Sequence, residues 1–134
     1  MLLVKTRIGP SQIDGIGLFA DEFIPKGTPV WKLVRDFDII LTPEQIASLS
    51  DAAREQFIHY GHLDIFTGEH VLCADNARFL NHSDDPNVCC YLLPTPNDED
   101  LDVAVRDIEK GEELTINYKE YDGNWPLKLG AARD

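Results

Sequence analysis

The stretch from Ala77 to Val88 gathers more chemically capable side chains than any other part of the sequence. Between its two ends it reads Arg-Phe-Leu-Asn-His-Ser-Asp-Asp-Pro-Asn, which places a guanidinium, amides, an imidazole, a hydroxyl and carboxylates between two apolar runs. Groups of these types can bind a polar small molecule or move protons, and they can equally satisfy the backbone of a polar loop. This stretch is therefore the first candidate for a functional site.

The same stretch divides into two structural halves. Residues 83–87 are typical of a turn, because Asp and Asn side chains bond their own backbone and Pro86 disfavours helix in the residue before it. Residues 78–80 predict a short buried turn that delivers Asn81 and His82 to the end of an element.

Two further motifs flank this stretch in the sequence. Residues 14–20 read Asp-Gly-Ile-Gly-Leu-Phe-Ala, and residues 111–118 read Gly-Glu-Glu-Leu-Thr-Ile-Asn-Tyr. Gly15 and Gly17 permit a positive φ or the close approach of a ligand to the backbone. Taken alone, this pair of glycines is equally explained by a plain tight turn.

In this order the three motifs resemble the signatures of SET domains, from about Lys5 to Tyr121. The resemblance implies a protein-lysine methyltransferase that uses S-adenosylmethionine. It also implies a mostly-β (α+β) fold of several small β-sheets, with a short helical insert and a C-terminal segment threaded as a pseudoknot, an exception to the usual rule of unthreaded connections.

The resemblance assigns roles residue by residue. The backbone of Gly15, Ile16 and Gly17 would cradle the methionine end of the cofactor, and Arg78 would line the same pocket. Asn81 and the backbone of His82 would hold its amino and adenine groups, and Tyr118 would stand where cofactor and substrate lysine meet. The implied site residues are therefore Gly15, Ile16, Gly17, Arg78, Asn81, His82 and Tyr118.

The chemistry of methyl transfer suits these residue types. A sulfonium already activates its methyl group, and orientation of the reactants supplies roughly 7–11 kcal/mol of such a barrier. The substrate lysine must also lose its proton, which costs roughly 4–5 kcal/mol at pH 7. An aromatic channel and a nearby positive charge lower that cost. Tyr118, itself neutral at pH 7 when unperturbed, is then an orienting and electrostatic partner rather than a general base.

Two departures from the family pattern concern the lysine channel. Many members complete it with a cysteine-rich zinc segment after the last motif, and this sequence has no cysteine after Cys90. Its wall must come from Tyr121 or Trp125 of the tail, or from a partner subunit. Ile116 replaces an aromatic residue that often limits the number of methyl groups, and it cannot hydrogen-bond a water. We therefore expect multiple methylation not to be blocked there.

Two other classes of function compete with an enzyme. One is a catalytically silent module that binds basic peptides, against which the intact Arg78, Asn81, His82 and Tyr118 speak. The other is a homodimeric scaffold with an acidic face. The sequence does not decide whether the chain forms a homodimer.

Composition narrows the partners. The 134 residues predict one domain, and the formal net charge of −12 argues against direct binding of nucleic acid. A basic, lysine-containing protein or peptide is favoured as substrate, although acidity also serves solubility. No apolar run is long enough for a membrane span and no signal peptide is evident, so a cytoplasmic location is expected. Cys73, Cys89 and Cys90 lack the spacing of a disulfide framework or a zinc site, and no metal is expected.

The elements that must position these motifs are mostly strands. Alternation and turn residues predict strands at Leu2–Ile8, Leu18–Ala20, Val30–Val34, Val71–Ala74, Val88–Leu93, Leu101–Arg106 and Leu114–Tyr118. The run from Val88 is expected to be buried on both faces, and the strand from Leu101 to bury Leu101, Val103 and Val105. The pattern Ile-x-Lys-Gly occurs at both Ile24 and Ile108, which indicates similar turns in different parts of the fold.

A helical insert separates the strand blocks. Thr42, Pro43 and Gln45 form a capping-box sequence, and Ser50 offers a second cap before a helix-compatible run to Gly61. We expect residues 1–121 to form the SET domain, with the insert at about 42–61. Residues 122–134 are expected to complete or cover the substrate channel.

Overall fold

The computed structural model describes residues 1–91 and 101–129. Its strands are β1 (Thr6–Pro10), β2 (Ile16–Ala20), β3 (Pro29–Lys32), β4 (Ile39–Leu41), β5 (His62–Leu63), β6 (His70–Leu72), β7 (Asn81–His82), β8 (Val88–Tyr91), β9 (Leu101–Ala104) and β10 (Thr115–Ile116). Its helices are α1 (Pro43–Ala47), α2 (Asp51–Tyr60), α3 (Trp125–Leu129) and the 3-10 turns η1 (Asn76–Phe79) and η2 (Tyr118–Glu120). The predicted mostly-β (α+β) class is confirmed.

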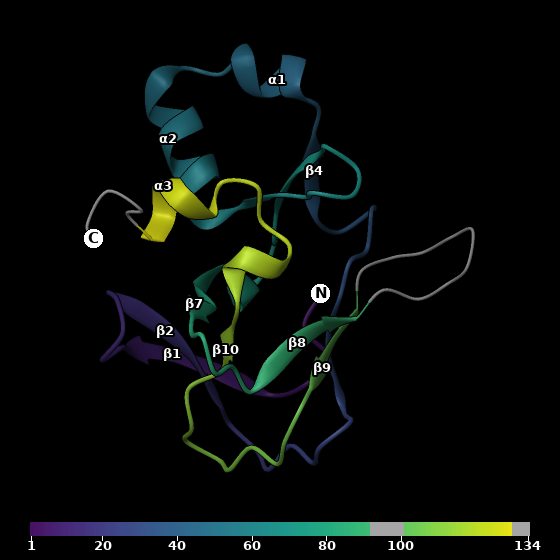
Figure 1. Ribbon diagram of the computed structural model, residues 1–134, viewed down its shortest axis with the longest axis vertical. Coiled ribbons are helices and arrows are strands. Elements are labelled where there is room, and N and C mark those ends of the chain that lie inside the picture. The colour runs from purple at the N-terminus through teal and green to yellow at the C-terminus, as the bar shows by residue number, and fades with distance from the viewer. Residues whose placement is uncertain (92–100, 130–134) are drawn as a thin grey trace.

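The strands form several small sheets rather than one large one. β1 pairs with β2 as a hairpin, β3-β9-β8 and β4-β6-β5 form three-stranded sheets, and β7 pairs with β10 in parallel. Figure 1 shows α1 and α2 at one end of the molecule and the hairpin and the β8–β9 ribbon toward the other, with β7 and β10 between the hairpin and the ribbon. No described helix is long and apolar enough to cross a bilayer.

The helical insert forms where its caps predict it. Thr42 accepts a hydrogen bond from the Gln45 N–H while the Gln45 side chain accepts one from the Thr42 N–H, which completes the capping box of α1. The Ser50 hydroxyl caps α2 by accepting a hydrogen bond from the Ala53 N–H. β4 and β5, the short strands on either side of the insert, were not predicted from the sequence.

The first hairpin lies further along the chain than expected. β1 begins at Thr6 and includes Gly9 and Pro10, which lie opposite Gly17 and Ile16. Leu2 makes only an isolated bridge, to Trp31. The predicted strand from Leu2 to Ile8 was therefore wrong at both ends. It begins later because the residues around Leu2 bond to β3 instead. It ends later because a proline is tolerated at the end of a hairpin strand where no ladder bond needs its N–H.

The sheet β3-β9-β8 reverses one prediction. Asp102 and Ala104 of β9 are buried, whereas Leu101 and Val103 are half-buried and Val105 is exposed. The alternation is present, but its inward face carries the carboxylate, because Asp102 pairs with Trp31 beside a cavity described below. β8 is not buried on both faces either, since Cys89 and Cys90 are half-buried. The predicted Leu92 and Leu93 lie outside the described residues.

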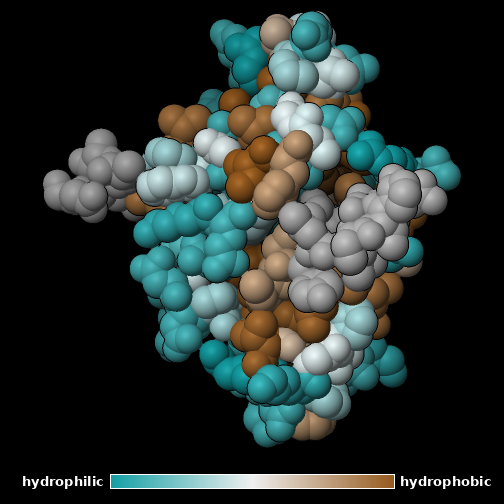
Figure 2. Space-filling model, turned by 45° about the vertical axis from the view of Figure 1, so that its right-hand side comes forward, coloured by the Kyte–Doolittle hydropathy of each residue, from teal (hydrophilic) through white to brown (hydrophobic). Residues whose placement is uncertain are grey.

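The main core gathers residues from distant parts of the chain. Leu18, Ile24, Ile108 and Leu114 are fully buried in one cluster. Ile24 and Ile108 bridge each other through reciprocal backbone hydrogen bonds, so the two Ile-x-Lys-Gly turns lie together and not in different parts of the fold. On the face shown in Figure 2, apolar side chains gather in the middle, and hydrophilic ones cover much of the left side and the lower end.

Candidate functional site

Two adjoining cavities lie between the hairpin, α2 and the C-terminal segment. The larger has a volume of about 370 Å³, within the range of about 300–1,000 Å³ that small-molecule sites occupy. Its walls come from Asp14, Gly15, Ile16, His59, Tyr60, Arg78, Phe79, Leu80, Asn81, Tyr118, Lys128 and Leu129. It therefore collects residues of all three sequence motifs.

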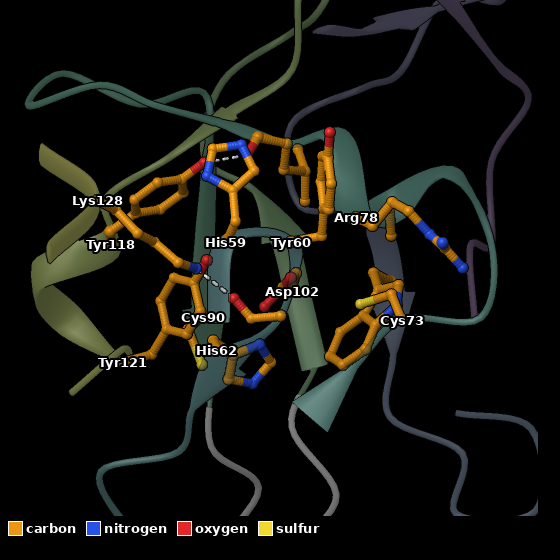
Figure 3. Close-up of a pocket in the computed structure, with 14 residues that line it drawn as sticks. His59, Tyr60, His62, Cys73, Arg78, Cys90, Asp102, Tyr118, Tyr121 and Lys128 are labelled. Carbon is orange, nitrogen blue, oxygen red and sulfur yellow. Dashed lines mark hydrogen bonds between the residues drawn. The ribbon is translucent and has the colours of Figure 1, made fainter. Parts of the chain in front are cut away.

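The smaller cavity has a volume of about 40 Å³ and lies beyond Tyr118. Trp31, His62, Asp102 and Tyr121 contribute to its walls. The two cavities share six lining residues, namely His59, Tyr60, Arg78, Leu80, Tyr118 and Lys128. Figure 3 shows these side chains arranged around the smaller cavity, with the Arg78 guanidinium pointing away from Tyr118 and Lys128.

The hairpin uses its two glycines for different reasons. Gly15 has φ +44°, a conformation that disfavours residues with a Cβ, and it lines the larger cavity. Gly17 has an ordinary φ, but an added Cβ would lie 2.5 Å from Glu113 Oε2 and 3.0 Å from the Ser11 Cβ. The close approach expected at this motif is thus made at Gly17 by Glu113. Gly17 itself lines neither cavity.

Asn81 joins the three motifs through its side-chain amide. Asn81 Nδ2 lies 3.0 Å from the Asp14 carbonyl oxygen and 3.4 Å from that of Ile16, both in the hairpin. It also lies 3.0 Å from Glu113 Oε2 and 3.1 Å from Ser11 Oγ. η1 and the pairing of β7 with β10 hold Asn81 in this position. Its nitrogen positions the glycine-containing hairpin at the edge of the larger cavity.

His82 faces Tyr118 rather than a cavity. Its Nδ1 accepts a hydrogen bond from the Tyr118 N–H at 3.1 Å, so the proton of the neutral ring lies on Nε2, which is 2.9 Å from Asp84 Oδ1. The expected contribution of His82 to the cofactor pocket through its backbone is not seen in the cavity lining. In this structure its ring fixes the backbone of Tyr118.

Tyr118 stands between the two cavities. Its hydroxyl donates a hydrogen bond to the Leu80 carbonyl, and its ring lies 6.3 Å from that of Tyr121 in an edge-to-face arrangement. Burial, with smaller contributions from Asp122 and other carboxylates, raises the Tyr118 pKa well above its ordinary value. The hydroxyl is therefore a neutral, fixed hydrogen-bonding group.

Of the three predicted channel residues, the structure places only Tyr121 at a cavity. Ile116 is 2% exposed and belongs to the main core, because β10 is only two residues long and buried on both sides. Trp125 lines neither cavity, and its ring contacts the Lys119 ammonium, whose Nζ lies 5.5 Å from the ring centroid. The expected alternation from Leu114 to Tyr118 ends at Ile116, and Tyr118 begins η2 instead.

A buried ion pair at the C-terminal segment was not predicted. Asp122 is fully buried, and its Oδ2 lies 2.7 Å from Lys128 Nζ, on a side chain that is 9% exposed. Its Oδ1 accepts hydrogen bonds from the N–H groups of Leu63 and Asn124. A lone acid and a lone lysine six residues apart gave no sequence signal, because only the turn from Asp122 to Trp125 and the helix α3 after it bring them together.

His59 and Tyr60 are the last residues of the helix-compatible run that was predicted up to Gly61. They end α2 as expected, but both also line the two cavities. No motif marks them, since they reach the site from the helical insert. Within the described residues, no three His, Cys, Asp or Glu side chains are placed to hold a metal ion.

His62 makes the stability of this site dependent on pH. Burial, assisted by Lys128 and opposed by Asp122, lowers the His62 pKa from 6.5 to about 4. Between these values the unfolded chain binds a proton that the folded chain does not, so stability is lost as pH falls. The free energy of unfolding falls by at most about 3 kcal/mol through this group. Urea unfolding at pH 7 and pH 4.5 should show a smaller loss for His62→Gln than for wild type, and equal losses would contradict the assignment.

Comparison with known proteins places this site in a family context. The family model for the SET domain matches residues 15–119. The chain is 31% identical over 124 residues to the Schizosaccharomyces pombe histone-lysine N-methyltransferase, H3 lysine-4 specific, covering 86% of this chain and 13% of that protein. It is 30% identical over 115 residues to Homo sapiens histone-lysine N-methyltransferase 2D, covering 81% of this chain and 2% of that protein. The chain thus spans a small part of these relatives.

A solved structure has a similar fold. It is the Chaetomium thermophilum Polycomb Repressive Complex 2 in an autoinhibited conformation, bound to S-adenosylmethionine. The TM-score is 0.67 at 23% identity, covering 97% of this chain and 17% of that chain. At this identity the likeness supports the fold.

Proposed function

Because the chain belongs to the SET-domain methyltransferase family, as its three motifs predicted, we propose that it is an S-adenosylmethionine-dependent protein-lysine N-methyltransferase. The observation that carries the proposal is the position of Tyr118, on the wall shared by a cavity of small-molecule size and a narrow aromatic one. A cofactor and a lysine side chain could meet at such a wall.

The larger cavity fits the cofactor in size and chemistry. Gly15 and Ile16 contribute backbone groups to its lining, and Asn81 and Arg78 contribute polar side chains. When bound, S-adenosylmethionine supplies a methyl group activated by a positive sulfur. Asp14 in the lining and the half-buried Glu113 carboxylate, which accepts from Asn81 Nδ2, favour a cationic ligand.

Tyr118 and Tyr121 would orient the substrate lysine. Their rings stand edge to face and exclude water from one side of the amine, which favours its neutral form. Since burial keeps the Tyr118 hydroxyl neutral and bonded to the Leu80 carbonyl, the tyrosine positions the amine and does not remove its proton. The lysine proton would leave to solvent before transfer.

The pairing of β7 with β10 extends the proposal to topology. It brings the Asn81–His82 segment beside the segment that leads to Tyr118. In SET domains these segments form a pseudoknot, and we place that threading at the β7–β10 pair in this chain. Residues from 122 onward would then cover the substrate channel.

The charge of the chain points to a basic substrate. A net charge of −12 attracts lysine-rich partners and speeds their encounter at low salt. The relatives are named for histone lysines, and we propose a basic, lysine-containing protein or peptide as the substrate class here.

Thermal unfolding with S-adenosylmethionine tests the cofactor site. At about 100 times its dissociation constant the ligand should stabilise the wild type by about 2.7 kcal/mol, a rise in Tm of several degrees. Asn81→Ala should lose most of this rise, because the hairpin wall loses its anchor. Each protein is compared with itself without ligand, which removes the direct effect of the substitution on stability.

Asn76→Ala is the matched control, since Asn76 is exposed in η1 and lines neither cavity. Its ligand-induced rise should equal that of the wild type. If the cofactor raises the Tm of none of the three proteins, the enzyme proposal is overturned and a module that binds basic peptides without turnover is favoured.

A further inference from the structure

The C-terminal helix α3 inserts one lysine side chain into the wall between the two cavities. The Lys128 side chain is 9% exposed and lines both the larger and the smaller cavity. Figure 3 shows it extending from α3 past Tyr118 toward the middle of the group of aromatic side chains. A lysine so deeply buried needs specific partners, because a buried charge without them is costly.

Three groups hold the Lys128 ammonium. The Asp122 carboxylate lies 2.7 Å from Nζ, and the Gly61 carbonyl at the end of α2 accepts a hydrogen bond from it. Its third partner is the Tyr118 ring, whose centroid lies 5.0 Å from Nζ. A carboxylate, a carbonyl and the face of a tyrosine form a complete site for an alkylammonium group.

This position matters because Tyr118 is the residue proposed to meet the substrate. Lys128 lines the wall between the two cavities. A substrate lysine that entered the smaller cavity would face the larger cavity across this same wall. Two lysine side chains cannot occupy it together. We therefore propose that Lys128 fills the substrate-lysine position in cis, so that a substrate lysine reaches Tyr118 only after Lys128 has been displaced.

The contacts of Lys128 suit a blocking group better than a methyl acceptor. An ammonium paired with a carboxylate has no lone pair with which to attack a methyl group. Asp122 therefore holds the Lys128 side chain in place and opposes methylation of Lys128. The inference rests on the proposed lysine methyltransferase function, and it adds a means of regulating that function.

The attachment of α3 is compatible with displacement. None of its described residues is buried as a whole, and Leu127 is 71% exposed. The preceding residues are held separately, since the Gly123 N–H bonds the Leu63 carbonyl at 2.7 Å and the Ile65 N–H bonds the Tyr121 carbonyl at 3.2 Å. Release of Lys128 could therefore move α3 while Tyr121 and Gly123 stay anchored.

The test removes the ion pair without leaving a buried charge. In the double variant Asp122→Asn with Lys128→Met, the Asn oxygen can still accept from the Leu63 and Asn124 N–H groups, and Met preserves the length of the lysine. Lys119→Met is the control for the lysine-to-methionine replacement alone, which it makes beside Trp125 at a residue that lines neither cavity. The 134-residue chains are assayed with S-adenosylmethionine and a random nonapeptide library with lysine at its centre.

We expect the double variant to raise kcat/KM for the library by about tenfold or more, because a site closed nine-tenths of the time weakens apparent affinity by that factor. Lys119→Met should match the wild type. Equal rates in wild type and double variant would overturn the blocking role and leave the enzyme proposal intact. So would methylation of Lys128 itself, detected by peptide mass in the wild type.

Failure of the enzyme proposal gives a different result. Cofactor binding is measured in the same proteins by thermal unfolding. If none of the proteins transfers a methyl group to the library, whether or not the cofactor binds, the enzyme proposal and the blocking role are both overturned. That outcome is distinct from equal, measurable rates.

Discussion

Replacing Tyr118 with phenylalanine is expected to lower kcat for lysine methylation by about 100-fold or more, because loss of orientation at the reacting centre has effects of that size. The substitution removes the hydroxyl that donates to the Leu80 carbonyl, and this bond fixes the ring at the wall between the cavities. The ring itself and the larger cavity remain. Cofactor binding should therefore change little, and single-turnover methyl transfer with saturating cofactor and lysine peptides is the measurement.

The effect of Tyr118→Phe on kcat must be separated from a simple loss of stability. Loss of a partner for the Leu80 carbonyl costs about 1–3 kcal/mol. Thr28→Val is the control, because the Thr28 hydroxyl also donates to a backbone carbonyl, that of Pro25, at 2.6 Å and away from both cavities. Full activity in Tyr118→Phe, with the control also active, would show that the tyrosine does not orient the reaction.

Replacing Asp122 with alanine should cause the largest loss of stability, about 3–5 kcal/mol, because Lys128 then either stays buried without its carboxylate or leaves the cavity wall together with α3. The Leu63 and Asn124 N–H groups lose their acceptor as well. A domain of this size is stabilised by only about 5–15 kcal/mol in total, so partial unfolding at room temperature is expected. Urea unfolding followed by circular dichroism measures the change.

A second ion pair supplies the comparison for Asp122. Asp51 pairs with Arg54 at 3.3 Å on α2, but its side chain is fully exposed. Asp51→Ala removes the same chemical group and should change stability far less, since water replaces the lost partner. Similar losses for the two variants would mean that the Asp122 pair is not effectively buried.

Local signals allowed much of the fold to be predicted. The caps of α1 and α2 were predicted because a capping box depends only on residues a few positions apart. The mostly-β class followed from short alternating runs separated by turn residues. Strand limits and faces were less predictable. Asp102 faces inward because its strand pairs with Trp31, and nothing within the strand itself records that pairing.

The residues of the candidate site also divide into those that local motifs predicted and those that they did not. Gly15, Arg78, Asn81 and Tyr118 were predicted through motifs, and the structure brings all four to one cavity. His59, Tyr60 and Lys128 reach that cavity from the helical insert and the last helix, where no motif marks them. Ile116 was assigned to the channel because the family resemblance places an aromatic channel residue two positions before the tyrosine. A two-residue strand followed by a 3-10 turn instead directs the two side chains to different places.

The parallel pair of β7 with β10 has a consequence for biosynthesis. Asn81 and His82 acquire their partner strand only when Thr115 and Ile116 have left the ribosome. Contacts between residues far apart in sequence also form slowly, because a long loop must close first. A nascent chain that already carries both glycines, Arg78 and Asn81 therefore has no completed pocket. Cofactor could stabilise the protein only late in its synthesis, after the chain has been exposed to chaperones and proteases without it.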